Sequence, residues 1–387
     1  MTRTPDGSSY FLYHSIGQYA GKTEDMTVAM AEFAQAWGRA DDGQWPVALG
    51  LRQRFIDRWR AILNAPEGTV TTSESVTSAL SSLMSALPAA ALRGRRLLVA
   101  GDCFPSVHFL LTGLQDRLGF TLDTVPLRQG ATWVEDEDIV SRWGADVGMA
   151  LLTWISSTSS HRSNVAALVA HGGKMGSLVG VDITQGAGLL PFDVMGPAVD
   201  FTVSTSLKWM CGSPGAGMLH VAAPLIARCR PELRGWFSQP DPFNWDFDRF
   251  SYAADIRRFD HGTPGIVACA ASLPALDWHA GQDKPALLAH NRALSAQILE
   301  GVTALGLSLV SPRDPQKRGG SVMLALPSEI PAARVLTAFR ASGIHADARS
   351  QTLRLSPGVL TTSAGVARML AVLAMAIGKQ APKDGAA

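Results

Sequence analysis

The sequence has almost no net charge and no long apolar run. Its 34 Lys and Arg residues nearly balance its 33 Asp and Glu residues, which leaves a formal charge of +1 over 387 residues. A chain without a strong field of either sign has little electrostatic affinity for nucleic acid or for an anionic membrane surface. No stretch reaches the roughly 18 uninterrupted apolar residues of a membrane-spanning helix. We therefore expect a protein that acts on small molecules, with neither nucleic acid nor membrane as a partner.

Cysteine is also scarce. The four cysteines, Cys103, Cys211, Cys229 and Cys269, are too widely spaced for a zinc pattern or a disulfide framework, so we expect reduced thiols and no metal site. Residues 1–9 lack the apolar core of a signal peptide, which together with the thiols predicts a cytoplasmic protein. A Gly-x-Gly-x-x-Gly motif after a first strand is missing as well, which argues against a nicotinamide-dependent dehydrogenase.

What the sequence does contain is a series of short apolar runs separated by helical stretches. Such an alternation predicts an α/β fold with a mostly parallel central sheet covered on both faces. The runs expected to form this sheet are 97–100, 120–122, 147–152, 178–181, 201–203 and 218–221. Further strands at 307–310, 321–326 and 352–355, between helices at 330–342 and 362–377, predict a smaller C-terminal α/β domain. We place an N-terminal helical arm at 1–65, a large domain at 66–285 and the small domain at 286–387.

One lysine and one carboxylate stand at the ends of two of these apolar runs. Asp182 ends the run Leu178 to Val181, and Lys208 follows the run Val199 to Val203 through a Ser/Thr-rich turn. Pyridoxal 5'-phosphate (PLP) needs these two groups: a lysine for the Schiff base, and a carboxylate that keeps the pyridine nitrogen protonated. The pair predicts a PLP site in which Lys208 and Asp182 are the catalytic groups.

A lysine in a loop is more often an exposed surface charge. The context of Lys208 favours burial, because an apolar strand precedes it and the glycine-rich turn 212–217 follows it. A glycine-rich turn allows the backbone to approach closely.

The hydroxyl-rich segment 71–78 leads into an apolar helical stretch. The free amide groups at a helix N-terminus bind anions, so this segment is a candidate phosphate site. An ordinary Ser/Thr helix cap is the alternative.

From about Tyr10 to the last predicted helix, the chain resembles the kynureninase-like branch of the PLP-dependent aminotransferase class V superfamily. The resemblance is carried by the segments 75–77, 102–106, 182–185, 207–209, 234–237 and 353–357. It implies fold type I and a homodimer with its active site at the subunit interface.

The resemblance also implies roles for individual residues. Val76, Thr77 and either Thr205 or Ser206 would bind the cofactor phosphate, while Phe104 would stack on the pyridine ring. Asp182 would pair with the ring nitrogen, and Gln185 would bind the ring hydroxyl. Trp236 and Thr263 would reach the phosphate of the neighbouring subunit. Arg354 would bind the substrate α-carboxylate, for which its guanidinium can form a two-pronged bond.

The sequence departs from kynureninases at several of these positions. Val107 replaces an aspartate, Leu207 replaces a hydrogen-bonding residue, and Gln185, Gln239 and Thr263 replace two histidines and an asparagine. These departures predict a small α-amino acid other than kynurenine as the substrate.

We expect an enzyme in which a Lys208 aldimine leads to side-chain cleavage, either by Cβ-Cγ hydrolysis or by β-elimination with C-S cleavage. A class V aminotransferase is the alternative activity. A catalytically inactive scaffold subunit is an alternative of another class, suggested by the apolar residues at 107 and 207. A sulfur-transferring desulfurase requires a mobile cysteine, for which the sequence offers no evident loop.

Overall fold

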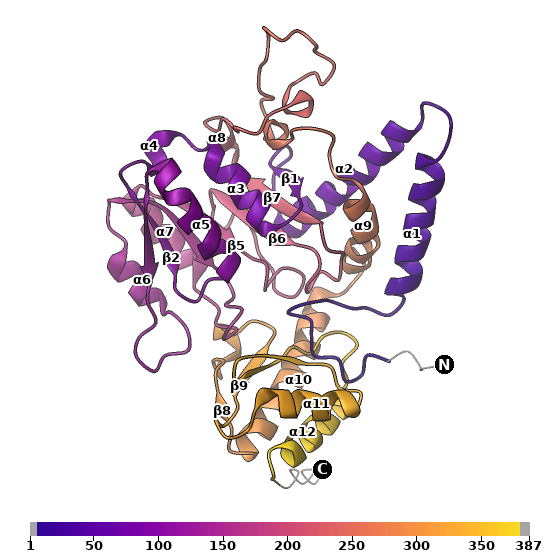
Figure 1. Cartoon of the computed structure of the whole chain (residues 1–387), viewed down its shortest axis with the longest axis vertical. Helices are drawn as coiled ribbons and strands as arrows, with labels where there is room; N and C mark the ends of the chain where they lie inside the picture. Colours follow the sequence, from indigo (N-terminus) through magenta and orange to yellow (C-terminus); the bar gives the residue numbers. More distant parts are fainter. Residues whose placement is uncertain (1–5, 380–387) are drawn as a thin grey trace.

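Two β-sheets organise the part of the chain that the structure describes (Figure 1). The structure is a computed structural model that describes residues 6–379. The larger sheet has seven strands in the order β1-β7-β6-β5-β4-β2-β3, and the smaller has four in the order β10-β11-β9-β8. The larger sheet is formed by β1 (Val70–Ser73), β2 (Arg96–Ala100), β3 (Thr121–Val125), β4 (Val147–Thr153), β5 (Leu178–Asp182), β6 (Phe201–Thr205) and β7 (Gly217–Val221). The smaller is formed by β8 (Ser308–Leu309), β9 (Val322–Ala325), β10 (Asp347–Arg349) and β11 (Thr352–Leu355).

The helices lie between and around these strands. They are α1 (Lys22–Trp37), α2 (Gln44–Leu63), α3 (Val76–Ala86), α4 (Ala89–Leu92), α5 (Pro105–Leu118), α6 (Asp136–Arg142), α7 (Val165–Met175), α8 (Ala223–Ile226), α9 (Val267–Ala280), α10 (Lys284–Ala304), α11 (Ala332–Ala341) and α12 (Ser363–Ala376). Short 3-10 turns are η1 (Trp236–Ser238), η2 (Ile256–Phe259) and η3 (Pro315–Lys317).

The predicted mostly parallel sheet is confirmed. Strands β3, β2, β4, β5 and β6 run parallel, whereas β7 is antiparallel to both β6 and β1. Strands β1 and β10 were not predicted from the sequence. Both are short and rich in hydroxyl or charged side chains, so neither shows an apolar run.

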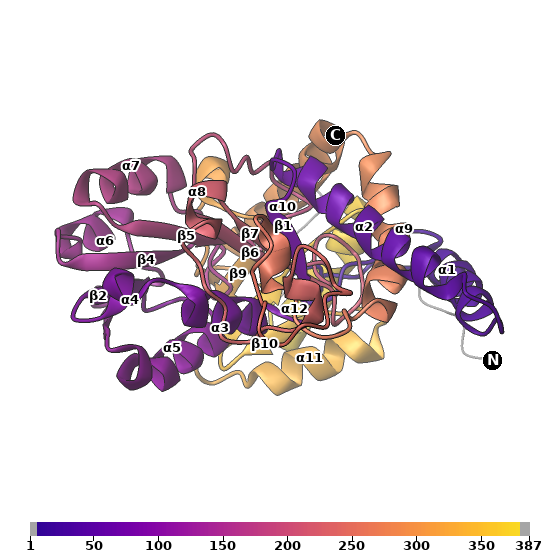
Figure 2. The same cartoon turned by 90° about the horizontal axis from the view of Figure 1, so that it is seen from above.

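Burial on both faces explains the near-continuous apolar sequence of the central strands. In β4, Ala150 and Leu152 belong to one buried cluster, which includes residues of α2, α6, α7 and α9. The alternating residues Met149 and Leu151 belong to the other cluster, with residues of α3 and α5. Since successive side chains of a strand point to opposite faces, each strand feeds both cores. Figure 2 shows the sheet between α6 and α7 on one side and α3 and α5 on the other.

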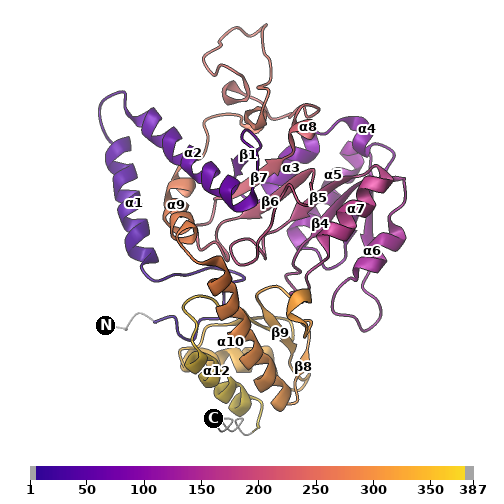
Figure 3. The same cartoon turned by 180° about the vertical axis from the view of Figure 1, so that it is seen from behind.

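The predicted boundary near residue 285 falls in the first turn of α10. This helix runs from beside α9 into the smaller domain, as Figure 3 shows. The segment before α1 also packs with the smaller domain rather than with α1 and α2. Tyr10 pairs with His345 and Leu12 with Ser356, and Phe11 is fully buried in the small-domain core. Burial of the apolar ring of Phe11 in the small-domain core stabilises the segment in this position.

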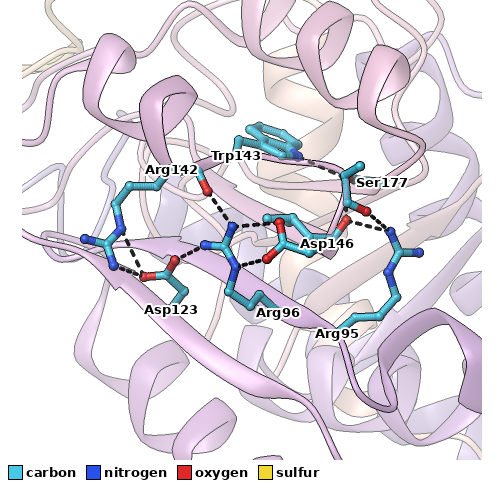
Figure 4. A network of polar contacts seen from close by, with 9 residues as sticks. Arg95, Arg96, Asp123, Arg142, Trp143, Asp146 and Ser177 are labelled. Carbon is cyan, nitrogen blue, oxygen red and sulfur yellow. Dashed lines mark hydrogen bonds and ion pairs between the residues drawn. The ribbon is translucent and has the colours of Figure 1, made fainter.

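An ion-pair network lies at the end of the large sheet where β2 and β4 begin (Figure 4). Arg96 pairs with the buried Asp123 and, through two nitrogens, with Asp146. Arg142 also donates to Asp123, at 2.6 Å. The network thus ties β2, β3 and the end of α6 together.

No helix within residues 6–379 is long and apolar enough to cross a membrane. Over the same residues, no group of three or more His, Cys, Asp or Glu side chains could hold a metal ion.

Arg96→Ala is expected to lower the free energy of unfolding by about 2 to 3 kcal/mol, because it removes one of the two cationic partners of a buried carboxylate. Arg117→Ala is the matched control, since it breaks an exposed pair with Glu232 and should cost less than about 1 kcal/mol. Urea unfolding followed by circular dichroism measures both variants. Equal losses would contradict a structural role for the network.

Candidate active site

A cavity of about 440 Å³ opens at the carboxyl ends of the central strands. Thr153 at the end of β4, Asp182 at the end of β5 and Thr205 at the end of β6 all line it. Loops at this edge of a parallel sheet carry the ligand sites of open α/β folds. The remaining lining residues are Glu74, Ser75, Val76, Thr77, Phe104, Ser106, Val107, Ile155, Ser157, Thr184, Gln185, Leu207, Lys208, Pro214 and Gly215.

Lys208 lies inside this cavity, in the connection from β6 to β7. Burial lowers the pKa of its amine to about 8, with Arg354 adding to the shift and the charge of Asp182 opposing it. Its Nζ atom lies 5.3 Å from the ring centroid of Phe104. Gly215 adopts φ +82°, which allows the turn after Lys208 to form the wall of the cavity. A lysine with a lowered pKa has more free amine at neutral pH, as a nucleophile requires.

Asp182 faces the same cavity from the end of β5. Its Oδ1 atom accepts a hydrogen bond of 2.9 Å from the backbone amide of Thr184, which fixes the carboxylate at the strand end. Burial raises the pKa of Asp182, and the bond from Thr184 and the charge of Lys208 act in the other direction. A carboxylate in this setting gains from a cationic N-H partner.

The first turn of α3 borders the cavity at Val76 and Thr77. Ser75 caps this helix, and its side chain accepts a hydrogen bond from the amide of Ser78. The predicted Ser/Thr cap is therefore present. It leaves the first amides of the helix, those of Val76 and Thr77, available for an anion, so the cap and the phosphate site are compatible readings.

The structure distinguishes the two hydroxyl residues at the end of β6. Thr205 lines the cavity, whereas Ser206 is fully buried away from it. The hydroxyl of Ser206 donates to the carbonyl of Ala216 at 2.8 Å and packs against Ser272. Of the two predicted phosphate ligands, only Thr205 is placed to reach the cavity.

Phe104 and Gln185 form two further parts of the cavity wall. Phe104 is 45% exposed, and a stacked ligand would cover its ring. Gln185 is buried, and its amide nitrogen donates to the carbonyl of His14 at 3.1 Å. The N-terminal segment is thereby tied to the cavity.

Arg354 lies beside the cavity, on β11 of the small domain. It is 6% exposed, and its Nη1 atom donates to the carbonyl of Ser157, a cavity residue, at 3.3 Å. Its other nitrogens bind Asp347. A buried arginine at the margin of the cavity could bind a carboxylate, and the sequence placed it correctly on a strand.

Trp236 and Thr263 are not among the residues that line this cavity. Thr263 is exposed, and Trp236 packs edge-on against Trp45, with ring centroids 6.4 Å apart. Within one chain these two residues are therefore not brought to the site, and their role toward a second subunit stays a prediction.

The departures from kynureninases fall in two places. Val107 and Leu207 line the cavity directly and make its wall more apolar. Gln239 lies elsewhere, in a side-chain bond of 3.0 Å with Asn244 that holds the loop after η1.

Two residues near Arg354 were not predicted from the sequence, His14 and Asp347. Asp347 accepts hydrogen bonds from Arg354, and His14 Nε2 lies 3.0 Å from Asp347 Oδ1. Asp347 sits directly opposite Arg354 in the β10-β11 hairpin. The opposite charges of Asp347 and Arg354 were a signal, but only the correct hairpin register shows that the two residues face each other.

The residues present fit PLP. The cavity of about 440 Å³ is lined by Lys208, whose pKa is lowered, and by the carboxylate of Asp182. The exposed ring of Phe104 and the first turn of α3, with its free amides, complete its wall.

Comparison with known proteins identifies a family and several relatives. The family model of aminotransferase class-V matches residues 57–369. A kynureninase of Deinococcus radiodurans is 27% identical over 83% of this chain and 73% of its own length. A kynureninase of Bacillus anthracis is 25% identical over 92% of this chain and 85% of its own. An uncharacterized aminotransferase of Bacillus subtilis, YcbU, is 24% identical over 82% of both.

Solved structures share the fold at lower identity. A cysteine desulfurase of Thermococcus onnurineus superimposes with a TM-score of 0.84 at 16% identity, over 98% of this chain and 99% of the other. The cystine C-S lyase C-DES, in complex with its product cysteine persulfide, superimposes with a TM-score of 0.84 at 19% identity, over 95% and 97%. These similarities confirm the predicted fold class.

Because the family model covers most of its length, this chain belongs to the aminotransferase class V family and is a PLP-dependent enzyme of fold type I.

Proposed function

We propose that this enzyme cleaves the side chain of a small α-amino acid other than kynurenine, with PLP held at Lys208. One observation carries the proposal: Lys208 and Asp182 line one cavity, and the buried Arg354 lies at its margin. The similarity to kynureninases and to a C-S lyase supports side-chain cleavage as the reaction type. The apolar Val107 and Leu207 in the cavity wall support a substrate that differs from kynurenine.

The bound cofactor supplies an electron sink for the bonds at the substrate α carbon. The chain's own residues do the rest. Asp182 would stabilise positive charge on the cofactor, while Val76, Thr77 and Thr205 would hold its phosphate. Phe104 would pack against its ring, and Gln185 would bind its ring hydroxyl.

Lys208 is the general base in this proposal. Its amine, with a pKa of about 8, accepts the proton from the substrate α carbon. In Cβ-Cγ hydrolysis the electron pair of the broken bond stays on the β carbon, which takes the proton, and water supplies the hydroxyl of the departing acyl group. In β-elimination the pair of the broken C-S bond leaves with the sulfur, which takes the proton. Arg354 holds the α-carboxylate, which orients the substrate toward Lys208.

Transamination is the alternative activity, supported by the similarity to YcbU. In that case the proton would return at the cofactor rather than at the substrate β carbon. Identification of the products by mass spectrometry distinguishes the two, because only transamination yields the 2-oxo acid with its side chain intact.

Sulfur transfer through a cysteine, in contrast, has no support among the described residues. All four cysteines are buried, and burial raises the pKa of Cys103 and of Cys211 to about 12. The scaffold alternative would require the loss of the site, yet Lys208, Asp182 and the helix amides remain together in one cavity.

We also propose a cytoplasmic homodimer in which Trp236 and Thr263 serve the partner's site. The loop between η1 and η2, which projects from the large sheet in Figure 1, exposes Phe243, Trp245 and Phe247. Exposed aromatic groups of this kind mark an interaction surface. The buried free thiols are consistent with a reducing compartment.

Lys208→Ala should abolish covalent attachment of the cofactor to the chain and lower kcat by about a thousandfold, because both the amine that forms the bond and the base are lost. Lys174→Ala, on α7, is the control and should change neither. Borohydride reduction followed by peptide mass spectrometry locates the attachment, and turnover of a panel of small amino acids measures kcat. Cofactor fixed by reduction to the Lys208→Ala chain, or to a wild-type residue other than Lys208, would refute the attachment.

The pH dependence of cofactor uptake reports on the amine of Lys208. Only the neutral amine attacks, so the rate of PLP uptake by cofactor-free protein should rise about tenfold per pH unit and level off above its pKa of about 8. Asp182→Asn should move this plateau to lower pH, because the charge of Asp182 raises the pKa of Lys208. Stopped-flow absorbance gives both profiles, and a rate independent of pH would contradict the assignment.

Subunit complementation tests the shared site. Lys208→Ala and Trp236→Ala homodimers should each have low activity. A refolded mixture should regain activity, because a hybrid dimer contains one site with both native residues. A mixture that remains as inactive as its components, although sedimentation shows dimers, would contradict the role of Trp236.

A further inference from the structure

Arg354 already has an anionic partner. Its Nε atom donates to Asp347 Oδ1 at 2.9 Å, and its Nη2 atom donates to Asp347 Oδ2. The two residues face each other across the β10-β11 hairpin, so the strand register fixes the pair. The bonds are therefore part of the fold rather than a chance contact of long side chains.

Asp347 is in turn held from the other side by the N-terminal segment. His14 Nε2 lies 3.0 Å from Asp347 Oδ1, and His14 Nδ1 lies 2.7 Å from the hydroxyl of Ser356. Although burial opposes it, the bonds from His14 and Arg354 hold the pKa of Asp347 well below its usual range. Asp347 therefore carries a full negative charge at neutral pH.

The geometry leaves one side of the guanidinium for a ligand. Asp347 occupies the edge formed by Nε and Nη2, and Nη1 points to the carbonyl of Ser157 in the cavity wall. A guanidinium has five N-H donors in a planar fork, so the outer edge formed by Nη1 and Nη2 keeps free hydrogens. A substrate carboxylate can bind that outer edge only with Asp347 still in place beside it.

We propose that Asp347 sets the strength of the carboxylate subsite, acting as a built-in counter-ion that weakens the hold of Arg354 on the substrate carboxylate. This inference rests on the proposed role of Arg354. Two carboxylates on one guanidinium repel each other, and the low dielectric of a buried site makes that repulsion larger than in water. Asp347 is thus a specificity-determining residue: it orients the arginine and limits carboxylate affinity.

Asp347→Asn tests the proposal, since it removes the charge and retains an oxygen that can accept from Arg354. L-alanine and L-alaninamide, which differ only in the carboxylate, are titrated into the PLP-loaded enzyme and followed by the absorbance of the cofactor. We expect Kd for L-alanine to fall about tenfold and Kd for L-alaninamide to change less than about twofold. The matched control is Arg349→Gln, an exposed neighbour 3.8 Å from Asp347, which should leave both values within about twofold.

A readout without cofactor chemistry uses the melting temperature. Propionate should raise the melting temperature of the D347N variant more than that of the wild type, and propionamide should affect neither. An unchanged or higher Kd for L-alanine in D347N, an equal change for both amines, or an equal gain from propionate would overturn the proposal. If instead the wild-type cofactor absorbance responded to neither amine, the role of Lys208 would fail, while the propionate measurement would still decide on Asp347.

Discussion

The burial of an amine and a carboxylate in one cavity is the constraint on which the site depends. Lys208 and Asp182 stand at the ends of neighbouring parallel strands, β6 and β5, and the register of those strands brings them to the same edge. Burial shifts the pKa of each toward its neutral form, and each one's charge partly offsets the shift of the other. The sheet thereby makes the amine of Lys208 reactive and places the carboxylate of Asp182 where it can stabilise a positive charge.

The N-terminal segment joins the parts of the molecule that the chemistry must bring together. The carbonyl of His14 accepts a hydrogen bond from Gln185 in the large domain, and the ring of His14 contacts Asp347 and Ser356 in the small domain. Phe11 anchors the same segment in the small-domain core. A few residues before α1 therefore fix the position of Asp347 and Arg354 relative to the cavity.

The sequence predicted most of the fold and the centre of the site. The parallel sheet, the family, the cofactor and the enzymatic nature of the protein are confirmed. The roles of the individual site residues and the homodimer stay predictions. Within the site, Val76, Thr77, Phe104, Gln185 and Thr205 line the predicted cavity, whereas Ser206 turns away because its hydroxyl bonds to Ala216. Strand alternation could not separate Thr205 from Ser206 in advance, because the strand ends at Thr205 and its period ends with it.

By itself, the sequence determined which strands are buried and which two strand ends carry the amine and the acid, because apolar runs and the residues that end them are local properties. Only the tertiary structure decided what surrounds Arg354. Its partners Asp347 and Ser157 come from a hairpin register and from the loop after β4, and His14, which contacts Asp347, comes from the N-terminal segment. Contacts between segments so distant in the sequence depend on how the whole chain packs, and no local pattern contains that information.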